Sequence, residues 1–280
     1  MVFKKIMKIF RNLSVRIIVG LSLTTMLLIL ALLAPVFATH DPYDTNVRNR
    51  LTKPSNEHLL GTDEYGRDVY SRIVYGSRVS IYVGFGVVLI STTLGSLIGL
   101  FAGYYRKLDG VLMRIMDALM SFPSILFAIA ILAAIGPNTS NVIIALAVVY
   151  TPRTARVVRG QVLSVREETY IESARVVGLG NMRIIFRYIL PNVMAVLIVQ
   201  ATFILALTII AEAGLSFIGA GTPAPTPSWG NILANGRPHM HSAPWMTIFP
   251  GLFIMVSVLG LNIVGDGLRD LLDPRLRGSE

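Results

Sequence analysis

The chain has 280 residues, of which 53% are hydrophobic and only 15% charged, and this excess of apolar side chains excludes an ordinary soluble domain. The net charge of +9 does not indicate nucleic-acid binding, because the basic residues flank apolar stretches and form no single basic stripe. The absence of cysteine excludes disulfides and cysteine-ligated metals. We therefore expect a protein embedded in the lipid bilayer, with no nucleic-acid partner.

Several charge-poor stretches are long enough to cross the hydrocarbon core, which takes about 20 helical residues. Between the third and fourth, the turn signal Gly136-Pro137-Asn138 predicts two antiparallel helices. We predict an all-α membrane protein with six transmembrane helices, at residues 17–39, 79–105, 113–136, 139–158, 192–217 and 245–266.

The first stretch has an alternative interpretation as a cleaved signal peptide, because small residues at Val36 and Ala38 have the spacing of a cleavage site. Its apolar run is longer than the roughly 7–15 residues of a signal core, and Pro35 crowds the site. An uncleaved first helix is therefore favoured.

Basic residues predict the orientation, since Lys and Arg concentrate in cytoplasmic segments. Most of them lie inside if the N-terminus is cytoplasmic, and the C-terminus is then cytoplasmic too. We divide the chain into residues 1–78, a first helix plus an extracytoplasmic loop, and residues 79–280, which hold the other five helices and a cytoplasmic loop at 160–191. The loop from 40 to 78 is predicted to form an ordered cap.

The cytoplasmic loop has the local signals of a helix-turn-helix. Ser164 and Glu167 have the spacing of a capping box, and Gly178 suits the left-handed residue that ends a helix. Asn181 is placed to cap a second helix, and Pro191 is tolerated where the fifth span begins. We therefore predict two short helices at the inner face of the membrane.

The first of these helices, with about 11 residues, is marginal in water by itself and is expected to need a docking partner. Glu172 offers a carboxylate to such a partner, and the small side chains of Ser173 and Ala174 permit close approach. The alternative is a solvated loop that only connects two spans, and periodicity does not separate the two.

Glu172-Ser173-Ala174, Gly178 and Leu190-Pro191 together resemble the loop by which permease subunits of bacterial and archaeal ATP-binding-cassette (ABC) importers contact their ATPase partners. Tyr188 departs from that pattern, which has Ile at this position, and this affects only fine contacts. When further short sequence motifs are considered, the resemblance to the C-type permease subunit of dipeptide and oligopeptide importers extends over nearly the whole chain. The further motifs are residues 58–80, 116–123, 211–219, 227–230 and 265–275.

This resemblance implies the type I ABC importer permease fold, with residues 79–280 as the transmembrane domain, in the inner or plasma membrane of a bacterium or archaeon. It implies a second homologous permease, two ATPase subunits and an extracytoplasmic substrate-binding protein as partners. The cargo implied is dipeptides or oligopeptides, while nickel chelates, glutathione and oligosaccharides are alternatives within the same class. The residues implied in ATPase coupling are Tyr170, Glu172, Ser173, Ala174, Gly178, Arg183, Leu190 and Pro191.

The sequence contains no G-x-x-x-x-G-K-[ST] phosphate loop, so ATP and Mg²⁺ are expected on the partner subunits and no cofactor, metal or catalytic residue is assigned here. An intramembrane hydrolase is a rival class, but H-E-x-x-H and G-x-S-x-G are both absent. The other rival is an ion-coupled secondary transporter in which Asp117 or Glu212 carries protons. His239 and His241 lie two residues apart, which is weak support for a metal site.

Charged residues near the spans have both structural and functional interpretations. We expect Asp117 to pair with Arg114, and Glu212 to lie at the outer boundary in a gate or packing role. Three arginines at helical spacing are expected to contact lipid phosphates or an acidic ATPase surface, namely Arg153, Arg156 and Arg159.

Polar and small residues within the spans suggest a pathway and a packing surface. The G-x-x-x-G spacing from Gly95 to Gly103 predicts close helix packing, either on the partner permease or within the subunit. Trp229 is expected to anchor a short segment flat in the membrane interface. Uncharged polar side chains proposed to line the pathway are Ser91, Gln200, Thr202 and Thr208.

Overall fold

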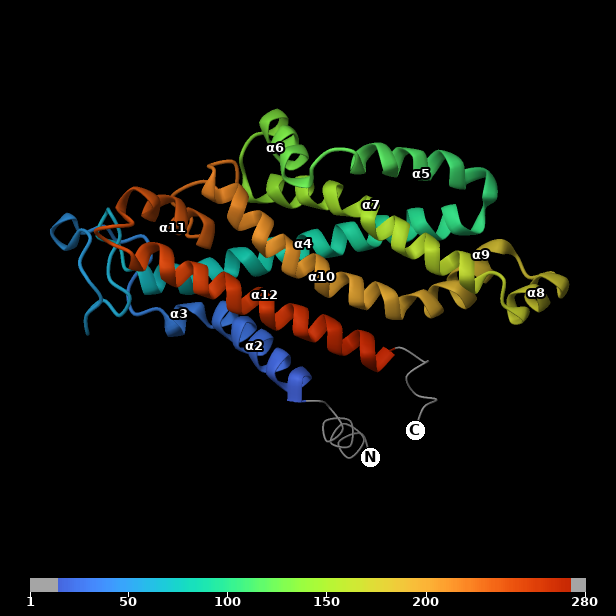
Figure 1. The fold of residues 1–280 in the computed structure, drawn as a ribbon, viewed down its shortest axis with the longest axis horizontal. Helices are drawn as coiled ribbons and strands as arrows, with labels where there is room; N and C mark the ends of the chain where they lie inside the picture. Colours follow the sequence, from blue (N-terminus) through green and yellow to red (C-terminus); the bar gives the residue numbers. More distant parts are fainter. Residues whose placement is uncertain (1–14, 273–280) are drawn as a thin grey trace.

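The computed structural model describes residues 15–272 and is almost entirely helical over that range (Figure 1). A bent pair of helices, α5 (Arg106–Met120) and α6 (Ser124–Ile135), forms a sixth span if counted as one. The predicted all-α membrane fold is thus confirmed. The helices long and apolar enough to cross a membrane are α2 (Val15–Leu32), α4 (Val69–Tyr104), α7 (Thr139–Val165), the run Asn181–Phe217 that includes α10 (Leu190–Phe217), and α12 (Trp245–Leu272).

The third predicted span, 113–136, is wrong as a single helix, because α5 and α6 meet at an angle of 90°. The break falls at Pro123, which is extended (φ −57°, ψ 127°) and cannot supply a helical N–H. Helix α5 lies along α7, whereas α6 turns away from that direction (Figure 1). The predicted span is thus divided between the end of the amphipathic α5 and the apolar α6.

The turn predicted between the third and fourth spans is confirmed. Gly136 adopts a positive φ of 88°, a conformation that favours glycine. The side chain of Asn138 then accepts a hydrogen bond of 2.9 Å from the backbone N–H of Ser140, which caps the start of α7.

Helix α4 begins at Val69, well before the predicted residue 79, so residue 78 lies within a continuous helix. Asp68 caps this helix, and its Oδ2 accepts a hydrogen bond of 2.7 Å from the backbone N–H of Ser71. The first predicted span corresponds to α2 followed by the short α3 (Ala34–Phe37).

The small-residue stripe of α4 packs against α7 of the same chain. A β-carbon on Gly99 would lie 2.7 Å from Cβ of Val158, and one on Gly103 would lie 2.6 Å from Cβ of Val162. Both distances are too short for a side chain, so glycine permits the close approach of the two helices. Of the two alternatives left open by the sequence, packing within the subunit is the one observed.

Two groups of non-spanning segments lie at opposite ends of the bundle (Figure 1). Residues 38–68, called the outer cap below, lie near α11 (Trp229–Gly236) at one end. Helices α8 (Thr169–Val176) and α9 (Asn181–Ile184) lie at the other end. The start of α2 and the end of α12 both point toward the α8 end, an arrangement compatible with the predicted shared side of the two termini.

The outer cap is ordered, as predicted, and is fixed to the bundle by Trp245, whose indole N–H donates a hydrogen bond of 3.1 Å to the carbonyl of Thr62. The predicted interfacial role of Trp229 is wrong. This side chain is fully buried, and its indole N–H donates to the carbonyl of Ile73 at 2.9 Å. A buried indole needs such an internal acceptor, so Trp229 fastens α11 to α4 within the protein.

Candidate coupling site

The elbow, defined here as residues 169–189, comprises α8, the turn at Gly178, α9 and a π-helical turn (Ile185–Ile189). The predicted capping box at Ser164 and Glu167 is wrong, because α7 continues to Val165 and no side chain caps α8. The reason is that the buried positions Val158 and Val162 continue the apolar face of α7 to Val165. Because this face is packed, α7 continues past Ser164, the residue predicted to cap the next helix.

Gly178 ends α8 as predicted. It has a positive φ of 81°, and its N–H donates to the carbonyl of Arg175 at 2.9 Å. The next N–H, that of Leu179, donates to the carbonyl of Ala174 at 3.0 Å. This pair of bonds is a Schellman motif, which satisfies two of the carbonyls left free at a helix end.

The second helix of the elbow differs from the prediction at its start. Asn181 does not cap it, because Gly180 occupies the cap position and the Oδ1 of Asn181 accepts a hydrogen bond of 2.8 Å from the Tyr104 hydroxyl. The helix then runs without a break into α10 through the π-helical turn, in which Leu190 N–H donates to Ile185. Pro191 therefore lies in the first turn of α10 but interrupts nothing.

The inward face of the elbow is covered by the chain itself. Ile171 and Ala174 are buried in a cluster with Ile184, Ile185 and Val162. Ala174 was predicted to let a partner approach closely, and this expectation is wrong for its side chain, which faces the protein interior. Its small size instead allows α8 to pack closely on the rest of the elbow.

The outward face of the elbow is exposed and carries four large apolar side chains among polar and charged ones. Val176 and Val177 expose 88% and 79% of their surface, and Met182 and Phe186 are also exposed. The predicted coupling residues Tyr170, Glu172, Ser173, Arg183 and Pro191 lie exposed on or beside this region, while Leu190 is half-buried.

The elbow is fastened to the inner end of α4. The guanidinium of Arg175 lies over the ring of Tyr104, 5.6 Å from its centroid, and Tyr104 also bonds Asn181 as described above. Arg166, at the end of α7, donates a hydrogen bond of 2.8 Å to the carbonyl of Gly103. The elbow thus contacts α4 directly and continues into α10 without a break.

Two ion pairs attach α5 to α7, and the first of them contradicts a sequence prediction. Asp117 pairs with Arg156 and not with Arg114. Asp109 pairs with Arg159 through two hydrogen bonds, of which the one from Nη2 to Oδ2 is 2.6 Å long. Arg156 and Arg159 pair with α5 because antiparallel α5 presents acids at matching positions, and the Arg156 side chain remains 51% exposed.

Glu212 is fully buried and serves packing within the subunit. Its Oε1 accepts hydrogen bonds from Ser216 Oγ at 2.8 Å and Thr222 Oγ1 at 3.4 Å, while Oε2 has no partner within residues 15–272. Thr222 N–H also donates to Ser216 at 3.0 Å. These bonds hold the segment after α10 against the end of that helix, which fits the packing role among the two predicted.

The predicted pathway residues do not share a surface. Ser91 and Thr208 are fully buried, and each hydroxyl donates to a backbone carbonyl of its own helix. Thr202 packs against Gly265 of α12, where an added β-carbon would lie 2.6 Å from its hydroxyl oxygen. Gln200 is buried, and its Nε2 lacks a partner in the described part of the chain. The hydroxyls of Ser91 and Thr208 therefore do not face a transport pathway in this structure.

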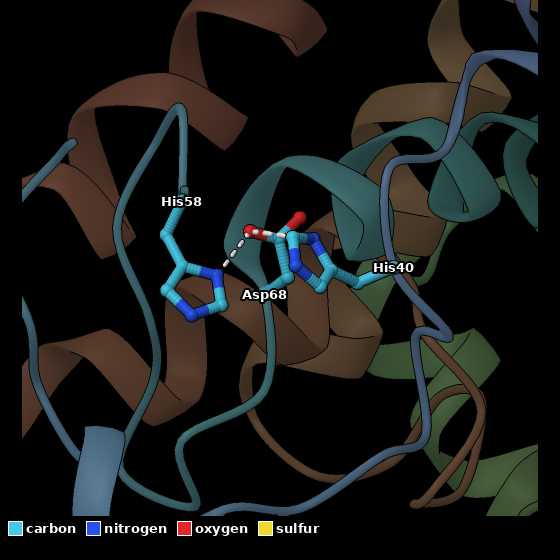
Figure 2. Close-up of side chains that lie close together, drawn as sticks. All are labelled: His40, His58 and Asp68. Carbon is cyan, nitrogen blue, oxygen red and sulfur yellow. Dashed lines mark hydrogen bonds and ion pairs between the residues drawn. The ribbon is translucent and has the colours of Figure 1, made fainter. Parts of the chain in front are cut away.

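One cluster was missed by the sequence analysis. His40, His58 and Asp68 meet between the outer cap and α4 (Figure 2), although 18 and 10 residues separate them along the chain. No spacing rule predicts this meeting, because it depends on how the cap folds. His239 and His241, in contrast, join no such cluster among the described residues.

The family model for binding-protein-dependent transport system inner membrane components matches residues 95–278. A putative peptide transport system permease protein of Brucella abortus is 50% identical over 270 residues, covering 96% of this chain and 90% of that protein. The dipeptide transport system permease protein of Alkalihalophilus pseudofirmus is 48% identical over 261 residues, covering 93% and 86%. The glutathione transport system permease protein of Pectobacterium atrosepticum is 45% identical over 225 residues, covering 80% and 75%.

The chain therefore belongs to the family of binding-protein-dependent transport system inner membrane components. This confirms the resemblance to permease subunits of peptide ABC importers that the sequence blocks carried. The family consists of transport components and not of enzymes, and several apolar helices make this member a multi-pass membrane protein.

Proposed function

We propose that this chain is the permease subunit of an ATP-driven importer, and that it forms with a homologous permease the pathway for dipeptides or oligopeptides. Relatives named for peptide or dipeptide transport align with more than nine-tenths of the chain, which supports a peptide cargo. The relative named for glutathione transport aligns over a shorter length at lower identity. Glutathione, nickel chelates and oligosaccharides are the alternative cargoes.

The observation that carries the proposal is the two-faced elbow. The side chains on its inward face are buried against the protein's own core. On the outward face, the exposed apolar side chains are Val176, Val177, Met182 and Phe186. Large apolar side chains exposed together on one short segment are candidates for an interaction site. We assign it to an ATPase subunit, with Glu172 as an anionic contact at its edge.

In this mechanism two ATPase subunits bind ATP and Mg²⁺ and close together, and each carries one permease elbow with it. Because Arg175 and Asn181 of the elbow contact Tyr104 of α4, and the elbow runs directly into α10, its displacement tilts the spanning helices. The tilt converts an inward-open into an outward-open pathway, which receives peptide from a binding protein outside. The ATPase contacts drive the change only by differing between the two states.

The orientation assigned by this proposal puts the elbow and both termini in the cytoplasm and the outer cap outside. The membrane is the inner or plasma membrane of a bacterium, since the relatives named above are bacterial. The outer cap then faces the substrate-binding protein.

The proposal is tested by charge reversal at Glu172, with Glu57→Arg on the exposed outer cap as the matched control. Both variants are expressed with the ATPase subunits and purified through a tag on the permease. We expect Glu172→Arg to lower ATPase recovery at least about tenfold, while membrane insertion and the control stay at wild-type levels. Undiminished recovery and peptide-stimulated ATP hydrolysis in Glu172→Arg would overturn the assignment, and transport without ATP would favour an ion-coupled carrier.

A further inference from the structure

His40, His58 and Asp68 lie far apart along the outer cap and converge beside the start of α4 (Figure 2). His40 follows α3, His58 lies within the cap, and Asp68 is the residue before α4. One ligand atom from each lies within 4.8 Å of the other two. We propose that these residues form a binding site for a divalent transition-metal ion, with Zn²⁺ the best match to two imidazoles and one carboxylate.

The two separations that involve Asp68 lie near those of a metal site. Zinc holds N and O ligands at about 2.0–2.2 Å, so two ligands of a tetrahedral site lie about 3.3 Å apart. Asp68 Oδ1 lies 3.0 Å from Nδ1 of His58 and 3.8 Å from Nδ1 of His40, values on either side of that spacing. The second oxygen of Asp68 stays committed to the N–H of Ser71, which orients the carboxylate.

Burial differs among the three ligands in a way that suits metal entry. The side chains of His58 and Asp68 are 8% and 1% exposed, whereas that of His40 is 37% exposed. The first two are therefore preorganised, and His40 can close on the ion from the solvent side. A water molecule can take the fourth position there.

The side chain of Asn49 lies behind the His58 ring, on the side away from Asp68. The Nε2 of His58 lies 3.5 Å from Nδ2 of Asn49, and turning the amide over presents Oδ1 as an acceptor for the imidazole N–H. Ligating histidines usually donate their other N–H to such an acceptor, which fixes the tautomer. Thr39 Oγ1 lies 3.0 Å from Nδ1 of His40, and this hydrogen bond must break when that nitrogen ligates an ion.

The expected consequence is a clamp at the outer end of the bundle. A single ion would join the start, the middle and the end of the outer cap, where Asp68 caps α4. Because the ion binds the folded cap and not the unfolded chain, it stabilises the fold by mass action.

The test uses the full-length chain, purified in lipid nanodiscs through a tag without histidine, stripped with EDTA and titrated with Zn²⁺ alone. We expect about one Zn²⁺ per chain by elemental analysis, together with a rise in unfolding temperature. His40→Gln should weaken binding by more than the roughly 10- to 100-fold typical of second-shell changes. His241→Gln, an exposed histidine outside the cluster, should bind like wild type.

His40→Gln removes a half-exposed side chain and leaves the bond between His58 and Asp68, so the cap should fold in this variant. An unchanged unfolding temperature in EDTA checks that fold. Substoichiometric Zn²⁺ in the wild-type chain, or equal Zn²⁺ affinity in wild type and His40→Gln, would overturn the proposal and leave a purely hydrogen-bonded cluster.

Discussion

The backbone N–H of Leu179 donates a hydrogen bond of 3.0 Å to the carbonyl of Ala174, and this bond fixes the direction in which the chain leaves α8. It can form only because Gly178, between them, takes a φ of 81°. The elbow's outward face owes its position to this turn, since the turn places α9 beside α8 and leaves Val176 and Val177 exposed at the tip.

Replacing Gly178 by alanine should therefore loosen the elbow. A left-handed conformation costs an L-residue about 1–2 kcal/mol, and no neighbouring atom lies within 4 Å of the new β-carbon, so the cost is conformational alone. Gly180→Ala is the matched control, because that glycine is equally open but has a φ of −65°. Chemical unfolding and peptide-stimulated ATP hydrolysis check this prediction. Equal behaviour of the two variants would show that the turn does not control the elbow.

The α4–α7 contact gives a second prediction. Gly103→Ala places a β-carbon 2.6 Å from Val162 Cβ, and such overpacking should destabilise the protein by about 1–3 kcal/mol. Adding Val162→Ala should recover part of the loss. Gly110→Ala in α5, where nothing lies within 4 Å, should instead stabilise by about 0.5–1 kcal/mol. Thermal unfolding in detergent separates these outcomes. Tolerance of alanine at residue 103 would mean that the two helices are not in close contact.

The ion pair between Asp109 and Arg159 predicts a recoverable charge swap. Both side chains are partly exposed, at 25% and 31%, so the coupling free energy should be of the order of 0.2–1 kcal/mol. Asp109→Arg and Arg159→Asp should each loosen α5 from α7, and the double variant should restore part of the stability. A double-mutant cycle on the free energy of unfolding measures the coupling. Strict additivity of the two changes would place α5 away from α7.

Glu64 in the outer cap predicts a pH dependence. Desolvation by burial raises its pKa above the ordinary value of 4.5, and its Oε2 finds no hydrogen-bond partner in the described structure. The folded chain thus holds this proton more tightly than the unfolded chain. The resulting stabilisation is complete below pH 4.5 and is lost as the pH rises through the folded-state pKa.

Glu64→Gln should accordingly be more stable than wild type at neutral pH, with the difference shrinking as the pH falls toward 4.5. Glu57→Gln, an exposed residue of the same cap, should show no such trend. Thermal unfolding across this pH range measures both. A Glu64→Gln variant that is destabilised at neutral pH would mean that the ion pair with Arg67 outweighs the desolvation.

The sequence predicted features that depend on local chemistry. Gly136 and Gly178 were identified by the conformations that only glycine adopts readily, and the start of α12 by the apolar run after Pro244. Prediction failed where a distant segment decided the outcome. Asp117 pairs with Arg156 on another helix and not with its neighbour Arg114. The indole N–H of Trp229 donates a hydrogen bond to a backbone carbonyl of α4.

The sequence located the segment that forms the candidate site, but it did not predict which of its side chains are exposed. The loop at 160–191 was located by its resemblance to an importer loop, yet which side chains face outward depends on how α8 packs. Ala174 turned inward, and the exposed tip at Val176 was not foreseen. The cluster of His40, His58 and Asp68 was missed for the same reason, because folding of the outer cap alone brings the three together.

The central claim is that the elbow lies in the cytoplasm and is covered by an ATPase subunit, and cysteine labelling tests it most directly. The chain contains no cysteine, so Val176→Cys and Val47→Cys, at sites 88% and 78% exposed, each provide a single reactive thiol. With an impermeant maleimide, intact cells should label only residue 47. Inverted vesicles should label residue 176, and bound ATPase should protect it. Labelling of residue 176 in intact cells, or no protection by the ATPase, would contradict the account.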